Sequence, residues 1–427
     1  MGDKGTFGRR VRGTVAGVAV ALAVAVAAGP AAADGVPAAP AGLEFYSPPA
    51  ELVAGAHGSV IWMRPLTGEP GVPGARNYLV LYRSVDAQGH SVAVSGTLAV
   101  PPGQAPEGGW PLISWAHGTT GVADICAPSR DSGPDYPAHD YTALVRSVQA
   151  RWVAAGYAVA QTDYQGLGTA GGHGYLIGEA EQRAVADMAL AAREVDPQIG
   201  TRWVAMGHSQ GGQAAIFTDA RAQQWAPQLQ LLGSVALAPA SHIGLTVHAA
   251  AVATRLGAAE ALDSIATATG TSERLGSIAT GGASFLPLLI RGAQTAADID
   301  PGAFLTPKAL GLLPQADDRC IGQLRARDSW GGLRPDEVFA RDADAKALTR
   351  VLDENEPSGL TFTAPLLVLQ GRSDTIVSPL ATDAMVAQQR LTGQPVEYRT
   401  YRGADHREVL EDSYNDALTW VDARFAR

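Results

Sequence analysis

The sequence of 427 residues has few charged side chains and a shortage of basic ones. Charged residues make up 17% of the chain, and 42 acidic residues against 32 basic ones give a formal net charge of −10. A nucleic-acid-binding domain needs a basic surface, and an anionic membrane attracts basic segments. The charge balance therefore argues against both as electrostatic partners.

Cysteine is also scarce, because the whole chain contains only Cys126 and Cys320. No group of cysteine and histidine has the spacing of a metal site, so we expect neither a metal ion nor a cofactor. An isolated cysteine pair in an exported protein most often forms one disulfide, worth up to roughly 5 kcal/mol when it closes a long loop. Two separate buried thiols are the alternative.

The N-terminus carries a basic and then an apolar segment. The basic side chains are Lys4, Arg9, Arg10 and Arg12. Residues 15–28 form an apolar run of about 14 residues, whereas a membrane-spanning helix needs about 20. Small residues at 31–33 suit cleavage, so we predict that residues 1–33 are a signal peptide and that the protein is secreted. A retained membrane anchor is the alternative, and the sequence does not distinguish Sec from Tat export.

The stretch 203–212 organises the rest of the chain. Apolar residues typical of a short buried strand are followed by Gly207, Ser209 and Gly211, in a G-x-S-x-G pattern, and then by a helical segment. A serine on such a sharp strand-to-helix turn presents its hydroxyl to a base. We therefore predict that Ser209 is a nucleophile; an ordinary glycine-rich turn is the alternative.

Strand-forming and helix-forming segments alternate along most of the chain. Strands are expected at 77–85, 91–100, 111–116, 156–163, 202–206, 229–238, 365–370 and 395–401. Helices are expected at 141–154, 179–195 and 407–424, and residues 34–54 are expected to form an irregular arm. This alternation predicts an α/β fold with a mostly parallel sheet and, from the first two strands, an antiparallel hairpin at its edge.

Residues 242–360 interrupt this pattern. Alanine-rich helical segments at 248–262, 293–298 and 340–352 are broken by glycine, proline and aspartate, with little strand character. We therefore predict a core in two parts, residues 34–241 and 361–427, with a helical cap inserted at 242–360. Apolar residues at 243–252 and 285–290 are expected to pack on the core or also to line an acyl pocket.

A serine nucleophile needs a base that is itself oriented by an acid, and in hydrolases with this turn the order is serine, acid, histidine. His406 follows the last expected strand, whereas His242 and His248 come too early in the chain. Asp374 ends the preceding strand and is favoured over two other candidates, Asp383 and Asp405. His208, within the turn, is expected to point away from the hydroxyl and to pack.

The developing oxyanion of acyl transfer needs hydrogen-bond donors. One is expected to be the backbone N–H of Gln210, the residue after the nucleophile. The other is expected in the loop at 117–120, where we favour Thr119 over Thr120. The G-x-G-x-x-G pattern at 166–171 is interpreted as a glycine-rich loop beside the active site, because it does not open a helix as a dinucleotide site would.

With these motifs in order, the chain resembles an α/β-hydrolase from about Asn77 to its end. More narrowly, it resembles bacterial members of the secretory lipase family. The matching pieces are residues 116–121, 163–168 and 207–212 and the helical insertion before Asp374. The resemblance implies a secreted lipase or esterase with a helical cap over an acyl tunnel. It also implies the roles of nucleophile, acid and base for Ser209, Asp374 and His406, with Thr119 and Gln210 as oxyanion donors.

We therefore expect a secreted serine carboxylic ester hydrolase. Its partner would be a small-molecule or lipid ester, preferably a medium- or long-chain glyceride, with transient contact to lipid interfaces. Shorter esters are nearly as well supported. An exopeptidase using the same triad and a non-catalytic binding module are the other readings, and the sequence leaves the oligomeric state open.

Overall fold

The computed structural model describes residues 1–2, 38–258 and 282–426. Internal contacts divide the chain into residues 1–35 and 36–427, and the fold below is that of the second unit. Nearly all of the predicted signal peptide and the end of the predicted helix 248–262 lie outside the described residues. None of the described helices is long and apolar enough to cross a membrane.

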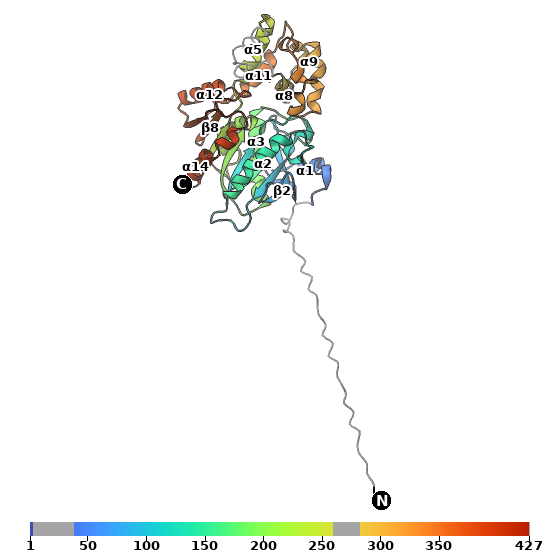
Figure 1. Ribbon diagram of the computed structural model, residues 1–427, viewed down its shortest axis with the longest axis vertical. Helices are drawn as coiled ribbons and strands as arrows, with labels where there is room; N and C mark the ends of the chain where they lie inside the picture. The colour runs from blue at the N-terminus through green and yellow to red at the C-terminus, as the bar shows by residue number, and fades with distance from the viewer. Residues whose placement is uncertain (3–37, 259–281, 427) are drawn as a thin grey trace. The chain divides into compact units, whose positions relative to one another are not determined.

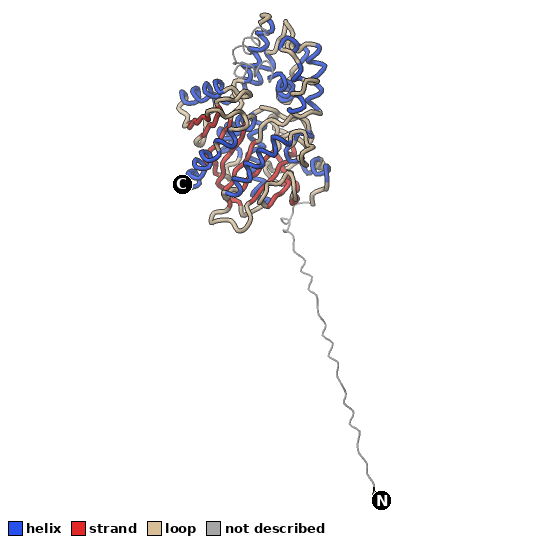
Figure 2. The backbone as a smooth tube through the Cα atoms, in the orientation of Figure 1, coloured by secondary structure: helices blue, strands red, loops and turns tan. Residues whose placement is uncertain are grey.

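The core is a nine-stranded sheet in the order β1-β2-β3-β5-β4-β6-β7-β8-β9 (Figure 2). Its strands are β1 (Val60–Pro65), β2 (Arg76–Val85), β3 (Ser91–Val100), β4 (Trp110–Ala116), β5 (Ala158–Thr162), β6 (Ile199–His208), β7 (Gln230–Leu237), β8 (Leu366–Gly371) and β9 (Val396–Tyr401). The pairs from β5 to β9 are parallel. Every residue of β5 and β8 is buried, as expected of parallel strands that are covered on both faces. The predicted α/β class and mostly parallel sheet are confirmed.

The predicted hairpin forms the antiparallel edge. β2 pairs with β3 along its full length, and the Asp86 carboxylate accepts hydrogen bonds from the amides of Gln88 and His90 in the turn between them. The sequence prediction missed β1, which pairs with β2 outside this hairpin. The prediction of an irregular arm at 34–54 was also partly wrong. That stretch contains η1 (Gly42–Tyr46) and α1 (Ala50–Val53), and its buried aromatic rings pack against β1 and β2.

Helices cover both faces of the sheet. The helices of the core are α2 (His139–Ala154), α3 (Gly178–Val195), α4 (Gln210–Trp225), α12 (Pro379–Leu391), α13 (Val409–Asp412) and α14 (Tyr414–Phe425). The alanine-rich sides of α3 and α4 pack on one face, whereas α2 and α14 pack larger aromatic side chains on the other; α2 lies in front of the sheet in Figure 1. One predicted helix, 407–424, is in fact two, because the chain bends at Ser413, whose hydroxyl bonds the Val409 carbonyl.

Between β7 and β8 the described residues form helices and loops and add no strand to the sheet. The helices are α5 (Ile243–Arg255), α8 (Leu286–Gln294), α9 (Pro307–Leu312), α10 (Ile321–Leu324) and α11 (Lys346–Glu354), with short 3-10 helices η5 (Gly282–Phe285), η6 (Pro301–Ala303), η7 (Leu313–Asp317), η8 (Trp330–Gly332), η9 (Pro335–Glu337) and η10 (Pro357–Gly359). Most of them share one apolar cluster and gather beyond one end of the sheet in Figure 1.

The sequence prediction misplaced all three helices of this insertion (residues 242–360), and the first, predicted from residue 248, begins at Ile243 as α5. The predicted helix 293–298 is wrong, because α8 begins at Leu286, where apolar side chains enter the cluster, and ends at Gln294. The predicted helix 340–352 begins six residues later, at Lys346. The apolar residues at 286–290 pack in the cluster. Burial in the cluster, rather than alanine content, decided these bounds.

A disulfide joins the insertion to the core. Cys126 and Cys320 are bonded, lie 194 residues apart in sequence and are fully buried. Next to the disulfide, the Ile321 amide donates to the Thr120 carbonyl at 2.8 Å. The predicted disulfide is thus confirmed, and it lies directly beside the loop that follows β4.

Candidate active site

The turn from β6 into α4 holds Ser209 in an unusual conformation. Its φ of 60° and ψ of −116° lie where residues with a side chain are strained. The glycines beside it are required sterically, because a Cβ on Gly207 would strike the Gly211 carbonyl and one on Gly211 would strike the Ala116 carbonyl. The Ser209 amide donates to the Leu237 carbonyl of β7 at 2.8 Å, which fixes the turn to the sheet.

The loops after β8 and β9 bring an acid and a histidine to this turn. The Ser209 Oγ lies 3.0 Å from His406 Nε2, and the His406 Nδ1 lies 2.7 Å from Asp374 Oδ2. The two loops are joined by a hydrogen bond from the Ser373 amide to the Ala404 carbonyl at 2.9 Å. Ser209, His406 and Asp374 are thus brought together in the order expected of a nucleophile, a base and an orienting acid.

The environment of Asp374 keeps its carboxyl ionised. Burial would raise its pKa, but the His406 ring and the amides of Val377 and Ile376 outweigh burial and hold the pKa below 3.8. These amides donate to Oδ1 at 2.9 and 2.8 Å, while Oδ2 faces the imidazole. An ionised carboxylate can only accept, so His406 carries its proton on Nδ1 and presents the lone pair of Nε2 to the serine.

The loop after β4 is held from three sides. The Tyr164 hydroxyl donates to the His117 carbonyl, the Gly118 amide donates to the Tyr141 hydroxyl, and the Thr119 hydroxyl bonds that of Tyr175. Because the Gly118 N–H is occupied, the amides of Thr119 and Thr120 are left, and within the described chain neither donates to another residue. The Gln210 amide, in the first turn of α4, has no intrahelical acceptor either.

The other candidate residues from the sequence lie in different places. Asp383 lies on α12 and pairs with Arg372. The Asp405 carboxylate accepts hydrogen bonds from the amides of the turn that follows it. His242 lies 3.8 Å from Glu356 at the start of α5, and His248 lines a separate surface cavity of the insertion. None of these four residues contacts Ser209 or His406 through a hydrogen bond or ion pair recorded among the described residues.

Comparisons with known proteins found similar lipases and an esterase. Residues 143–268 match the family described as "Secretory lipase". A curated relative, "Lipase A" of Moesziomyces aphidis, is 27% identical over 212 residues, which is 48% of this chain and 43% of that protein. The match thus spans less than half of the relative. The closed-state structure of Candida antarctica lipase A superimposes with a TM-score of 0.67 at 18% identity, covering 90% of this chain and 85% of that one.

The chain has the α/β-hydrolase fold and resembles the secretory lipases. A second structure, the rice cell wall degrading esterase LipA from Xanthomonas oryzae, has the same fold with a TM-score of 0.63 at 17% identity, covering 86% of this chain and 98% of that one. At these identities the structures show the fold, and the arrangement of side chains in the site is read from this chain itself.

Sequence reasoning missed a buried network around the Gln210 side chain. Gln210 Nε2 donates to Glu181 Oε1 at 2.7 Å and lies 3.0 Å from His173 Nε2. Burial raises the pKa of Glu181 to about 8 and lowers that of His173 to about 3, so both are neutral at pH 7. An acidic side chain in the first turn of the helix after the glycine-rich loop was the only signal for Glu181.

The glycine-rich loop lies beside this network. His173 follows the loop, and its Nδ1 bonds the Gln165 carbonyl at 2.9 Å. The loop, the residues at 122–124 and α8 of the insertion border a cavity of about 770 Å³. An open, polar cleft therefore lies next to the network that holds Gln210.

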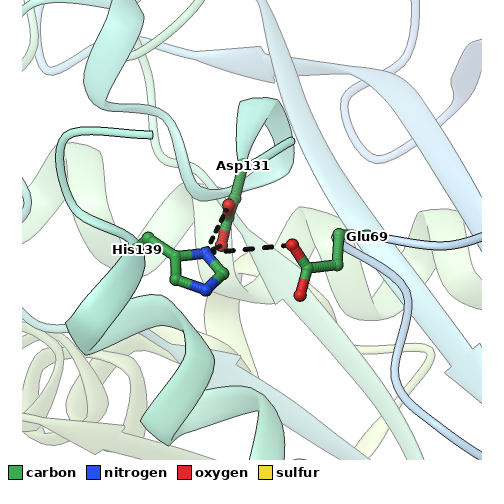
Figure 3. A group of neighbouring side chains, drawn as sticks. All are labelled: Glu69, Asp131 and His139. Carbon is green, nitrogen blue, oxygen red and sulfur yellow. Dashed lines mark hydrogen bonds and ion pairs between the residues drawn. The ribbon is translucent and has the colours of Figure 1, made fainter. Parts of the chain in front are cut away.

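One cluster outside the site has side chains of the metal-binding type: Glu69, Asp131 and His139 (Figure 3). Asp131 Oδ1 lies 2.9 Å from His139 Nδ1, whereas Glu69 lies 3.9 Å from the same atom. Arg146 already pairs with both carboxylates, at 2.8 Å from Asp131 and 3.0 Å from Glu69. The cluster is therefore an ion-pair network around a resident cation, Arg146, which joins α2 to the loop before β2.

Proposed function

We propose that this protein is a serine carboxylic ester hydrolase, a lipase or esterase, that works through an acyl-enzyme on Ser209. The observation that carries the proposal is the hydrogen-bonded series from Ser209 Oγ through His406 to Asp374, with distances of 3.0 and 2.7 Å. It stands at a strained strand-to-helix turn, which is the geometry of a nucleophile in this fold.

In the first half of the reaction, Ser209 Oγ attacks the ester carbonyl while His406 Nε2 takes the hydroxyl proton. Asp374 stays ionised and stabilises the imidazolium that forms. The amide of Gln210 and that of Thr119 or Thr120 bind the oxyanion of the tetrahedral intermediate. The intermediate then collapses, the bond to the alcohol breaks, and His406 gives its proton to the departing alcohol.

In the second half, His406 removes a proton from water, and the hydroxide attacks the acyl carbonyl. The resulting intermediate expels Ser209, which regains its proton from the imidazolium, and the free acid departs. Each proton taken by His406 is returned within the same half-reaction. The cycle consumes one ester and one water and leaves the enzyme unchanged.

We propose acyl esters of medium or long chains, including glycerides, as substrates, with contact to lipid interfaces in passing. The apolar cluster of the insertion reaches Tyr175, whose hydroxyl bonds Thr119, so apolar surface begins next to the proposed oxyanion loop. The similar proteins are described as lipases and a cell wall degrading esterase. By this proposal residues 242–360 act as a cap over the site.

We further propose that residues 1–33 direct secretion and are removed, leaving a core of residues 34–241 and 361–427 around the cap. A disulfide is typical of proteins in oxidising compartments, and the match to secretory lipases points the same way. The test is the N-terminal sequence of the protein recovered from the medium of the expressing cells. A mature chain that begins before residue 15 would contradict it.

The activity is tested with p-nitrophenyl esters of two to sixteen carbons. Ser209→Ala should lower kcat by about 10⁴-fold or more, while the matched variant Ser114→Ala, at a buried serine of β4, should keep it. Rising kcat/KM with chain length would support a lipase, and activity confined to the shortest esters an esterase. Equal activity in wild type and Ser209→Ala would overturn the proposal, and cleavage of an aminoacyl anilide in place of esters would favour an exopeptidase.

A further inference from the structure

The side chain of His208, next to the proposed nucleophile, turns away from Ser209 and connects two other parts of the site. His208 Nε2 lies 2.7 Å from the backbone carbonyl of His406, 198 residues further along the chain. His208 Nδ1 lies 3.0 Å from the Tyr141 hydroxyl, which also receives the Gly118 amide at 2.7 Å. One hydrogen-bonded series therefore runs from the loop after β4 to the loop that carries His406.

The chemistry of the partners fixes every proton in this series. A carbonyl oxygen can only accept, so His208 carries its hydrogen on Nε2 and donates it to His406. Its Nδ1 then has a lone pair, which accepts the Tyr141 hydroxyl proton. The Tyr141 oxygen in turn accepts the Gly118 N–H. Each bond has one donor and one acceptor, and the series closes only with a neutral His208.

The surroundings favour this neutral form. His208 and Tyr141 are 1% and 7% exposed. Burial lowers the pKa of His208 to about 3, and the nearby His406 ring, 4.5 Å away between centroids, acts in the same direction. Protonation of His208 on Nδ1 would remove the acceptor of the Tyr141 hydroxyl proton. The series is therefore intact throughout the neutral pH range.

Two neighbouring residues, Gly118 and Arg407, contact the series. A Cβ on Gly118 would strike the Tyr141 hydroxyl and would lie 3.1 Å from His208 Nδ1, so only glycine lets the three groups meet. The Arg407 guanidinium lies over the Tyr141 ring, 5.7 Å from its centroid, so the residue after His406 contacts the same tyrosine. The loop of the base and the loop of the oxyanion donors thus meet at Tyr141 and His208.

We propose that His208 and Tyr141 are positioning residues, which fix the backbone of His406 relative to the Gly118–Thr120 loop so that base and oxyanion donors are assembled together. The inference rests on the proposed ester hydrolysis and deepens it. His406 must face the serine and then the leaving alcohol while its own backbone stays in place. A small shift of a base relative to the donors lowers turnover without weakening substrate binding.

Two substitutions at His208 separate its two bonds. His208→Gln keeps an N–H near the position of Nε2 and loses the acceptor for Tyr141. His208→Asn keeps an acceptor near the position of Nδ1 and loses the bond to His406. Tyr141→Phe breaks the series at the tyrosine, and Tyr157→Phe is the matched control, a buried tyrosine whose hydroxyl bonds Asp422 at the opposite end of β5.

For each variant, kcat is measured per active serine, titrated with a p-nitrophenyl phosphonate, together with KM for a short ester and the midpoint of thermal unfolding. We expect kcat to fall about 10- to 100-fold in His208→Asn and about 10-fold in Tyr141→Phe, with KM changed less than about twofold. His208→Gln should keep at least about a third of kcat, and Tyr157→Phe should lower only the unfolding midpoint.

A purely structural role predicts a different result. In that case the variants lose stability, but every titrated serine turns over at the wild-type rate, which would overturn the inference. Equal loss of kcat in His208→Asn and His208→Gln would overturn it as well. The proposed function is tested separately. If the wild type hydrolyses esters and Ser209→Ala does not, the proposed function holds whether or not His208 and Tyr141 are positioning residues.

Discussion

The sheet edge that carries the site and the inserted helices are held together by different interactions. At the sheet edge, buried polar groups bond to one another, as in the series through Asp374, His406 and His208. In the insertion, helices and short 3-10 turns pack through one apolar cluster. Hydrogen bonds fix distances and directions, whereas apolar packing tolerates changes of shape. The proposed chemistry is therefore specified at the sheet edge, while the apolar surface of the insertion can vary.

The two regions nevertheless meet at a few polar points. The disulfide and the bond from the Ile321 amide to the Thr120 carbonyl tie the insertion to the loop after β4. On the other side, the Asn355 Oδ1 accepts the Gly178 amide, at the start of α3. Through Thr120, the loop of the proposed oxyanion donors is bonded to the insertion. Through Gly118, Tyr141 and His208, it is connected to the loop that carries His406.

The largest expected effect is on the acid of the sheet edge. Asp374→Asn should lower kcat by about 10³- to 10⁴-fold, because a neutral amide cannot hold the Nδ1–H form of His406 or stabilise its charge. The matched variant is Asp383→Asn, which removes a half-exposed carboxylate paired with Arg372 and should leave kcat unchanged. Steady-state kinetics on both variants decide the point. Similar kcat values in the two would rule out Asp374 as the acid.

The second prediction concerns the disulfide that joins the two regions. Replacing both cysteines, Cys126→Ser with Cys320→Ser, should lower the free energy of unfolding by up to about 5 kcal/mol, because a long loop becomes free in the unfolded chain. Denaturant unfolding measures the loss. A reductant should destabilise the wild type and leave the double variant unaffected; equal sensitivity of the two proteins would contradict this account.

The third prediction tests whether packing holds the insertion. Leu348→Ala, at a fully buried position of α11, should lower the free energy of unfolding by about 2–5 kcal/mol through the cavity it leaves. Asp317→Asn is the contrast, because its ion pair with Arg291 is exposed and worth less than about 1 kcal/mol. Thermal unfolding compares the two. A larger loss in Asp317→Asn would mean that polar bonds, not packing, stabilise the insertion.

The smallest effect concerns Glu181 and depends on pH. Its pKa is raised from 4.5 in the unfolded chain to about 8, so the folded state keeps a proton that the unfolded state releases. The stabilisation from this proton is complete below about pH 4.5 and is lost as pH rises towards 8. Glu181→Gln has no such proton, so its stability relative to wild type should increase from pH 5 to pH 8. A constant difference would contradict the assignment.

Much of the core was predictable because local and global preferences agree there. The G-x-S-x-G turn and the hairpin carry short-range signals, and the order of Ser209, Asp374 and His406 selects among the other acids and histidines. The strand β1 was missed because its sequence includes Met63, Arg64 and Pro65. It lies at the edge of the sheet and pairs with β2. Only its first three residues, Val60, Ile61 and Trp62, favour a strand, and a run of three is too short to predict one.

The rest of the site depends on contacts between residues far apart in sequence. His208 was expected only to pack, and its bond to the His406 carbonyl joins positions 198 residues apart. The network of Glu181 and Gln210 likewise arises when α3 and α4 lie side by side. In the insertion, the bounds of α8 follow from which apolar side chains reach the shared cluster. Such contacts exist only in the folded chain, so sequence patterns do not reveal them.

The disulfide also bears on the order in which the proposed active site is assembled during synthesis. A chain is made from its N-terminus, so Cys126 emerges long before Cys320, and at about 5–20 residues per second roughly 10 to 40 seconds separate them. During that interval the loop after β4 lacks both its covalent bond and the Ile321 amide. Ser209 emerges within that interval, whereas the base at position 406 emerges only after it. By the proposed mechanism, a nascent chain made only as far as Cys320 would therefore lack its base and be inactive.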